Sequence, residues 1–221
     1  MANFKKGILG GFSGKVGNVV GGSWKGTDYL RSLPSGDRQT NSVQQQLQQQ
    51  KFKAVIGFVR PMLELVRVGY HAEAGRVSAY NAATSYLFKN ALVGDADTGY
   101  SIDYSKALLA KGTLPGCAGL SVTSAEACML NFSWRDNSAV AGASASDVFY
   151  AAVYCPAKNN AVVSLYLTRR DSMQAALELP DAWQGETVQV FAGFTTLAAL
   201  GGKPTRSTVS ESQYAGEVLI A

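Results

Sequence analysis

Seven short segments with β-type patterns follow one another in residues 113–221, and their spacing constrains the fold more than any other feature. Turn-forming sequences such as RDNS, PAKNN, RRDS and LPDAWQGE separate several of them. Short strands with a turn every eight to twelve residues or so are typical of a β-sandwich. We therefore predict an immunoglobulin-like or fibronectin-III-like sandwich with Trp134, Tyr150 and Tyr154 in its core. The predicted strands are 118–124, 127–134, 147–155, 161–168, 173–179, 187–198 and 206–220.

The segment before this region has helical spacing. Ser42 followed by Gln45 matches a capping box, and apolar residues then recur at helical intervals. Pro61 is expected to kink or end this helix, because proline lacks the backbone N–H that a helix interior uses. A second helix is predicted over SAYNAATSYLFKNAL, with Ser78 as its N-cap, so that the two form a helical hairpin. A turn and a strand at 100–109 are expected to follow.

Five glycines, two lysines, an arginine and a tryptophan occur within GKVGNVVGGSWKGTDYLRSLP, residues 14–34. Its valines predict one short strand, and the alternation that follows the tryptophan predicts another, with turns at Gly21-Gly22 and Lys25-Gly26. A two-stranded hairpin is marginally stable alone, so we expect this arm to fold against a partner chain. The predicted assembly interface consists of Val16, Val19, Val20, Trp24, Lys25, Tyr29 and Arg31.

These patterns predict an α+β chain with three regions. The first, 1–39, is a basic glycine-rich arm. The second, 40–112, contains the helical hairpin and a connecting strand. The third, 113–221, is the β-sandwich.

Composition and charge fit this division. Only 16% of residues are charged, which is consistent either with a large core or with a surface that neighbouring subunits cover. Residues 1–70 hold ten Lys or Arg and three Asp or Glu, whereas the remainder holds ten and thirteen. Such a basic segment fits docking onto the acidic body of another subunit, and also contact with nucleic acid or a membrane surface.

No pattern in the sequence predicts catalysis or a bound cofactor. Gly14-Lys15 lacks the remaining residues of a phosphate-binding loop, and no GxSxG or metal-ligand spacing occurs. His71 is the single histidine and is expected to be a capping or solvated residue. The three cysteines lack CxxC spacing and are expected to be buried free thiols, and "DAD" at 95–97 lacks the later ligands of a calcium loop.

We therefore expect a non-enzymatic structural protein that self-assembles through its arm, as a subunit of a phage-like particle or a filament. One alternative is a module that binds a peptide or glycan through sandwich loops such as RDNS or TTLAALGGKPT. Another is a nucleic-acid-binding protein that uses the basic arm. No secretory signal or apolar membrane span is recognisable, so synthesis in the cytoplasm is expected, with a place in a virion or other particle left open.

The opening FKKGILGGFSGKVGNVVGGSWKGTDYLRSLP resembles the start of the DUF6266 family, which is found in Bacteroidetes. Members begin with a similar G-x-x-G-x-V-G-x-x-V-x-x-x-W-K-G-x-x-Y-x-R run. A helical stretch, a β-rich half and a serine-rich end like STVSESQYAG follow. The resemblance is strongest over residues 4–34, and it implies no activity, cofactor or site residue.

Overall fold

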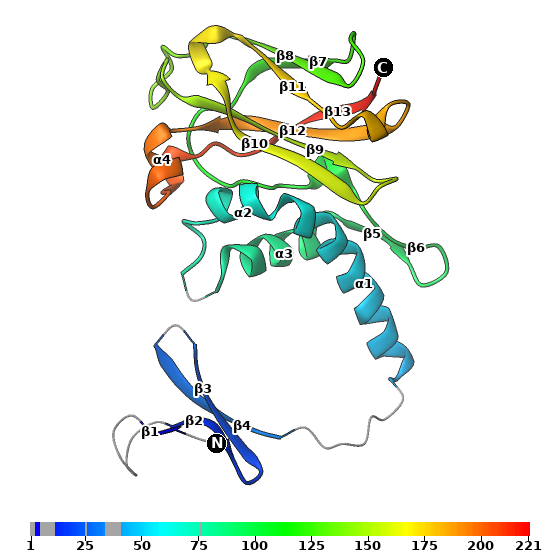
Figure 1. Cartoon of the computed structure of the whole chain (residues 1–221), viewed down its shortest axis with the longest axis vertical. Helices are drawn as coiled ribbons and strands as arrows, with labels where there is room; N and C mark the ends of the chain where they lie inside the picture. The colour runs from blue at the N-terminus through cyan, green and yellow to red at the C-terminus, as the bar shows by residue number, and fades with distance from the viewer. Residues whose placement is uncertain (1–2, 5–11, 25, 34–40, 76) are drawn as a thin grey trace. The chain divides into compact units, whose positions relative to one another are not determined.

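The computed structural model describes residues 3–4, 12–24, 26–33, 41–75 and 77–221. The chain forms two compact units, Met1–Val43 and Gln44–Ala221. Its class is α+β, with one helical region and several antiparallel sheets, as the sequence predicted at this level (Figure 1). Residues 40–112 and 113–221 were expected as separate regions, but almost all of both lie in the second unit.

The helices are α1 (Val43–Val59), α2 (Leu63–Gly69), α3 (Ala79–Asn90) and α4 (Leu197–Gly201). The strands of the first unit are β1 (Asn3–Phe4), β2 (Phe12–Val16), β3 (Val19–Trp24) and β4 (Thr27–Ser32). Those of the second unit are β5 (Leu92–Asp95), β6 (Gly99–Ile102), β7 (Ala118–Thr123), β8 (Met129–Arg135), β9 (Val148–Cys155), β10 (Asn160–Arg169), β11 (Gln174–Glu178), β12 (Thr187–Thr195) and β13 (Gln213–Leu219).

A four-stranded sheet with the order β10-β9-β12-β13 is the middle layer of the second unit. A three-stranded sheet, β11-β8-β7, lies on one of its faces and the helices α1, α2 and α3 on the other (Figure 1). All eight residues of β9 are buried. Because successive strand side chains point to opposite faces, Tyr150 and Tyr154 join the core under the helices, whereas Phe149 and Val153 join the core between the sheets. Trp134 lies in this second core, so all three predicted core aromatics are buried.

Helix boundaries follow local chemistry. Helix α1 ends at Val59 and continues as a 3₁₀ turn that contains Pro61, as the proline predicted. The hydroxyl of Ser78 accepts a hydrogen bond from the backbone N–H of Asn81 at 3.1 Å, which confirms the predicted N-cap of α3. Within the described residues, no helix has both the length and the apolar character required to cross a membrane.

The first unit consists of a four-stranded antiparallel sheet with the order β1-β2-β3-β4, which we call the N-terminal sheet. The predicted turn at Gly21-Gly22 is wrong. Gly17 and Asn18 form the turn between β2 and β3, where Gly17 has a φ of 55°, a conformation that favours glycine. Gly26 lies in the turn between β3 and β4, whereas Gly21 and Gly22 lie within β3.

Three other predicted strands have different bounds in the structure. The strand expected at 100–109 ends at Ile102, because Asp103 caps a 3₁₀ turn by accepting a hydrogen bond from the N–H of Ser105. The strand expected at 187–198 ends at Thr195, since the hydroxyl of Thr196 caps α4. The strand expected at 206–220 begins only at Gln213, after a capped 3₁₀ turn.

A buried ion pair packs against the core between the sheets. Arg170 is fully buried, and its Nε and Nη2 atoms each lie 3.1 Å from Oδ2 of Asp147. The guanidinium also donates to the carbonyl of Pro115 and the side chain of Asn137, and it lies 3.8 Å from the ring centroid of Phe194. A buried charge is tolerated when it is paired and hydrogen-bonded in this way.

Replacing Asp147 with alanine should therefore lower the free energy of unfolding by about 3–5 kcal/mol, because it leaves a buried guanidinium without its counter-charge. The control is Glu186→Ala, which breaks the partly exposed pair with Lys158 and should cost about 1 kcal/mol or less. Urea unfolding of both variants measures the difference. Equal losses would contradict this role for the Arg170–Asp147 pair.

Candidate functional site

The N-terminal sheet carries every residue of the predicted assembly interface except Lys25, which lies outside the described residues. The strand register shows which of these residues share a face. Val20 lies opposite Arg31, and Tyr29 lies opposite Gly22. Trp24 follows two residues after Gly22, so Val20, Trp24, Tyr29 and Arg31 belong to one face.

Val16 and Val19 form a cross-strand pair on the other face of the sheet. Leu30, which the sequence analysis did not select, belongs to that same face because it lies opposite Gly21. The predicted interface residues are therefore divided between two faces. Strand alternation could have separated them once the turn at Gly17-Asn18 was recognised in place of the one expected at Gly21-Gly22.

Gly21 and Gly22 allow aromatic residues to pack closely across the sheet. A Cβ atom at Gly21 would lie 2.1 Å from the backbone oxygen of Phe12, and one at Gly22 would lie 2.9 Å from the ring of Tyr29. Real Cβ atoms do not approach other atoms so closely, so larger residues would displace these neighbours. The two glycines thus serve close packing rather than a turn.

Both faces of the N-terminal sheet expose large apolar side chains. Trp24 is 58% exposed and Leu30 is 65% exposed, and Val16, Val19 and Tyr29 are also exposed. Trp24 and Tyr29 share their face with the basic residues Lys15 and Arg31, because Lys15 lies opposite Val20. Exposed apolar groups gathered on one small sheet are characteristic of an interaction surface.

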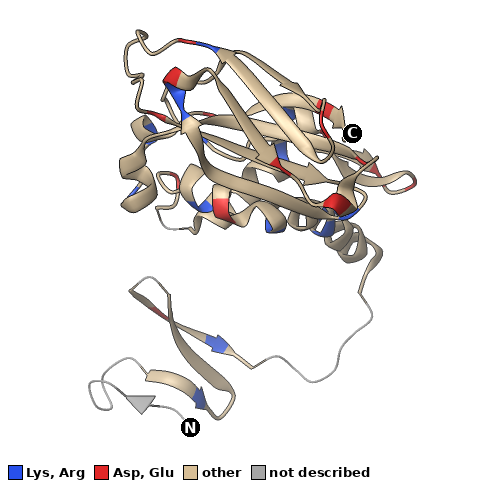
Figure 2. Cartoon of the chain, turned by 45° about the horizontal axis from the view of Figure 1, so that its top comes forward, with Lys and Arg blue, Asp and Glu red and all other residues tan. Residues whose placement is uncertain are grey.

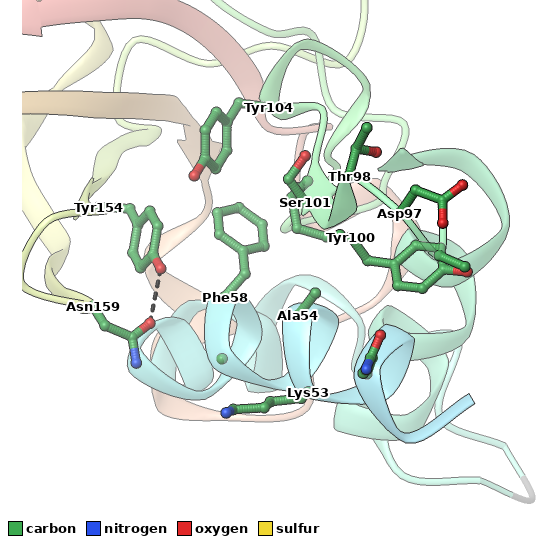
Figure 3. A pocket seen from close by; sticks show the side chains of 15 residues that line it. Lys53, Ala54, Phe58, Asp97, Thr98, Tyr100, Ser101, Tyr104, Tyr154 and Asn159 are labelled. Atoms are coloured by element: carbon green, nitrogen blue, oxygen red, sulfur yellow. Dashed lines mark hydrogen bonds between the residues drawn. The ribbon is translucent and has the colours of Figure 1, made fainter. Parts of the chain in front are cut away.

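The second unit has a groove of about 760 Å³, lined by α1, the β5–β6 hairpin and the turn between β9 and β10 (Figure 3). The rings of Phe58, Tyr104 and Tyr154 contact one another: Phe58 lies 5.5 Å from Tyr104 and 5.1 Å from Tyr154 between centroids, and the two tyrosines are 6.1 Å apart. The hydroxyl of Tyr154 donates to Oδ1 of Asn159 at 2.9 Å. This groove was not predicted from the sequence, because its residues come from three separated segments.

Two tyrosines of the groove have raised pKa values. Burial raises the pKa of Tyr154 to about 12 and also raises that of Tyr104. Both phenols are protonated near neutral pH, and that of Tyr154 is already used as the donor to Asn159. Among the described residues, no three His, Cys, Asp or Glu side chains are grouped so that they could hold a metal ion.

The remaining candidate residues have structural partners. Nδ1 of His71 lies 2.9 Å from the carbonyl oxygen of Pro204, which ties the end of α2 to the loop after α4. Cys117, Cys128 and Cys155 are free and buried, as predicted. Burial raises the pKa of Cys117 to about 12, so this thiol is a weak nucleophile.

A family model described as a family of unknown function, DUF6266, matches residues 11–216. The chain belongs to this family. The DUF6266 match begins just before β2 and ends within β13, so it includes most of both compact units and confirms the resemblance predicted from the sequence. A search of curated proteins found no match.

The exposure of Trp24 predicts a fluorescence result. Trp134 and Trp183 are buried, so Trp24 should supply most of the emission that acrylamide quenches in dilute protein. The variant Trp24→Phe should lose this quenchable emission, whereas Trp183→Phe, which replaces a buried tryptophan, should retain it. Equal quenching losses in the two variants would contradict the exposed position of Trp24.

Proposed function

We propose that this protein is a non-enzymatic structural protein that self-assembles through its N-terminal sheet. The observation that carries the proposal is the exposure of Trp24, Tyr29 and Leu30 on a sheet of only four short strands. Burying a large apolar side chain contributes about 1.5–3 kcal/mol, so covering a few of them offsets the cost of docking such a small sheet. A subunit of a phage-like particle or filament would use this contact.

The two units differ in net charge. Residues 1–43 hold six Lys or Arg and two Asp or Glu, whereas residues 44–221 hold fourteen of each. Figure 2 shows that charged residues are scattered over the second unit, with most of each strand uncharged. Lys15 and Arg31 lie on the same face of the N-terminal sheet as Trp24 and Tyr29. Their positive charges would favour a partner surface that carries acidic or aromatic side chains.

We also infer that β7 to β13 form a fibronectin-III-like sandwich. One sheet consists of β7, β8 and β11, and the other consists of β9, β10, β12 and β13. These are the first, second and fifth strands and the third, fourth, sixth and seventh strands of the domain. This division of strands is typical of fibronectin type III domains, which hold many unrelated functions. The helices α1–α3 cover one face of the four-stranded sheet and so remove that face from ligand binding.

A second candidate function is ligand binding in the groove of the second unit. Tyr100 and Tyr104 are half-buried at its wall, and Lys53, Asp97 and Asn159 add polar groups. Such a mixture of rings, amides and charges suits a peptide or a glycan. Binding there is independent of the N-terminal sheet, so a shortened chain that lacks residues 1–40 would retain it.

Self-assembly predicts a concentration-dependent increase in mass for the full chain, measured by light scattering. A chain starting at Asn41 should stay monomeric, because the second unit has its own cores. Trp24→Ala should weaken association on the order of tenfold or more, whereas Lys15→Ala should weaken it less than about fivefold, because exposed charges contribute little.

A full chain that stays monomeric at micromolar concentrations in both low and high salt would contradict self-assembly. Association that requires added nucleic acid, disappears with nuclease and depends more on Lys15 than on Trp24 would instead favour the nucleic-acid alternative.

A further inference from the structure

The longer edge strands of the second unit contain bulges, whereas the five-residue edge strand β11 does not. In the described residues of Gln44–Ala221, the sheet edges of six or more residues are β7, β10 and β13, and each carries extra residues relative to its neighbour. The register shifts lie between Ala118 and Ser121 in β7, between Ser164 and Thr168 in β10, and between Tyr214 and Gly216 in β13. Bulges of this kind prevent an edge from pairing with another chain.

Strand β4 has no such interruption. It lies at the edge of the N-terminal sheet and pairs with β3 in an unbroken register from Val19 opposite Ser32 to Trp24 opposite Thr27. All six of its residues are exposed. A regular, exposed edge strand is a template for pairing with another strand.

The hydrogen bonds to β3 determine which backbone groups of β4 point outward. The N–H of Leu33 donates to the carbonyl of Asn18 at 2.8 Å, so this pair is hydrogen-bonded. Because hydrogen-bonded and non-hydrogen-bonded pairs alternate in an antiparallel ladder, Arg31 and Tyr29 also bond to β3. The N–H and C=O groups of Asp28, Leu30 and Ser32 therefore point away from β3.

We propose that β4 pairs antiparallel with β4 of a second copy, about a two-fold axis at Leu30. This inference rests on the proposed self-assembly and specifies one of its contacts. In this register Leu30 lies opposite the same residue of the other copy, and Asp28 lies opposite Ser32. Every outward N–H and C=O group of these three residues then has a partner, and the two N-terminal sheets become one continuous sheet.

The side chains favour this register over its neighbours. It places Tyr29 opposite Arg31 on one face, where a guanidinium can stack on the ring, and two Leu30 side chains in contact on the other. A two-fold axis at Asp28 or at Arg31 would instead place like charges directly opposite each other. An axis at Tyr29 would set Leu30 against Asp28 and leave the outward groups of Ser32 unpaired.

A two-fold contact of this kind is fully occupied once two copies have associated. The same patch serves both partners, so the contact produces a dimer and does not propagate. A particle or filament would therefore need a second, different contact between the dimers. The surface of the N-terminal sheet that carries Trp24 remains available for it, because edge pairing uses the backbone of β4.

Two sets of variants of the full chain test this pairing. Leu30→Pro removes one outward N–H without removing a bond to β3, and it should weaken dimerisation at least tenfold. Leu30→Thr keeps that N–H and should weaken dimerisation only a few-fold. Circular dichroism verifies that each variant retains its fold.

Cross-linking tests the register directly. Residues opposite each other in a hydrogen-bonded pair have Cα atoms about 5.5 Å apart, so Leu30→Cys should form dimers rapidly with a short bis-maleimide. Ser23→Cys, on β3 and one strand in from the edge, should cross-link much more slowly. The native cysteines do not compete, because all three are buried.

Fast cross-linking at position 30 together with loss of dimers in Leu30→Pro supports the proposal. If the protein assembles but Leu30→Pro assembles equally well and both cysteine variants react equally slowly, the β4 contact is overturned while self-assembly stands. A full chain that never associates overturns both.

Discussion

The structure of the second unit, Gln44–Ala221, depends on the burial of β9 on both of its faces. Tyr150 and Tyr154 require a cover of helices, and Phe149 and Val153 require a cover of strands, so neither layer can be removed without exposing one side of the sheet. The consequence is that the helical segment and the β-rich half lie in one compact unit. Its aromatic contacts, such as Phe58 with Tyr154 on the helix side and Trp134 with Phe149 on the other, lie on opposite sides of the same strand.

The two units differ in the regularity of their edge strands and in the exposure of their large apolar side chains. In the second unit, bulges in β7, β10 and β13 interrupt the long edges, and the aromatic side chains are mostly covered. In the N-terminal sheet, β4 is regular and Trp24 and Leu30 are exposed. Bulged edges and a regular edge thus occur in the same chain. A partner that covers the N-terminal sheet explains the regular edge β4 better than a general tolerance of exposed edges does.

Much of the fold was predictable from local patterns, because Ser78, Pro61 and the spacing of turns in the β-rich half act over a few residues. The packing of the helices on the four-stranded sheet was not, since Tyr150 and Tyr154 look the same in sequence whether a helix or solvent covers them. Gly21-Gly22 was mistaken for a turn because close packing and positive φ both select glycine. Leu30 was missed for a related reason: its face depends on the register, which a misplaced turn changes.

Amide hydrogen exchange of β4, resolved residue by residue by NMR at several protein concentrations, tests whether β4 is a pairing edge. Tyr29 and Arg31 bond to β3, so their amides should be protected at every concentration. The amides of Asp28, Leu30 and Ser32 should exchange quickly in dilute protein and become protected as the chains associate. Rapid exchange of those three amides in protein that light scattering shows to be assembled would contradict the account.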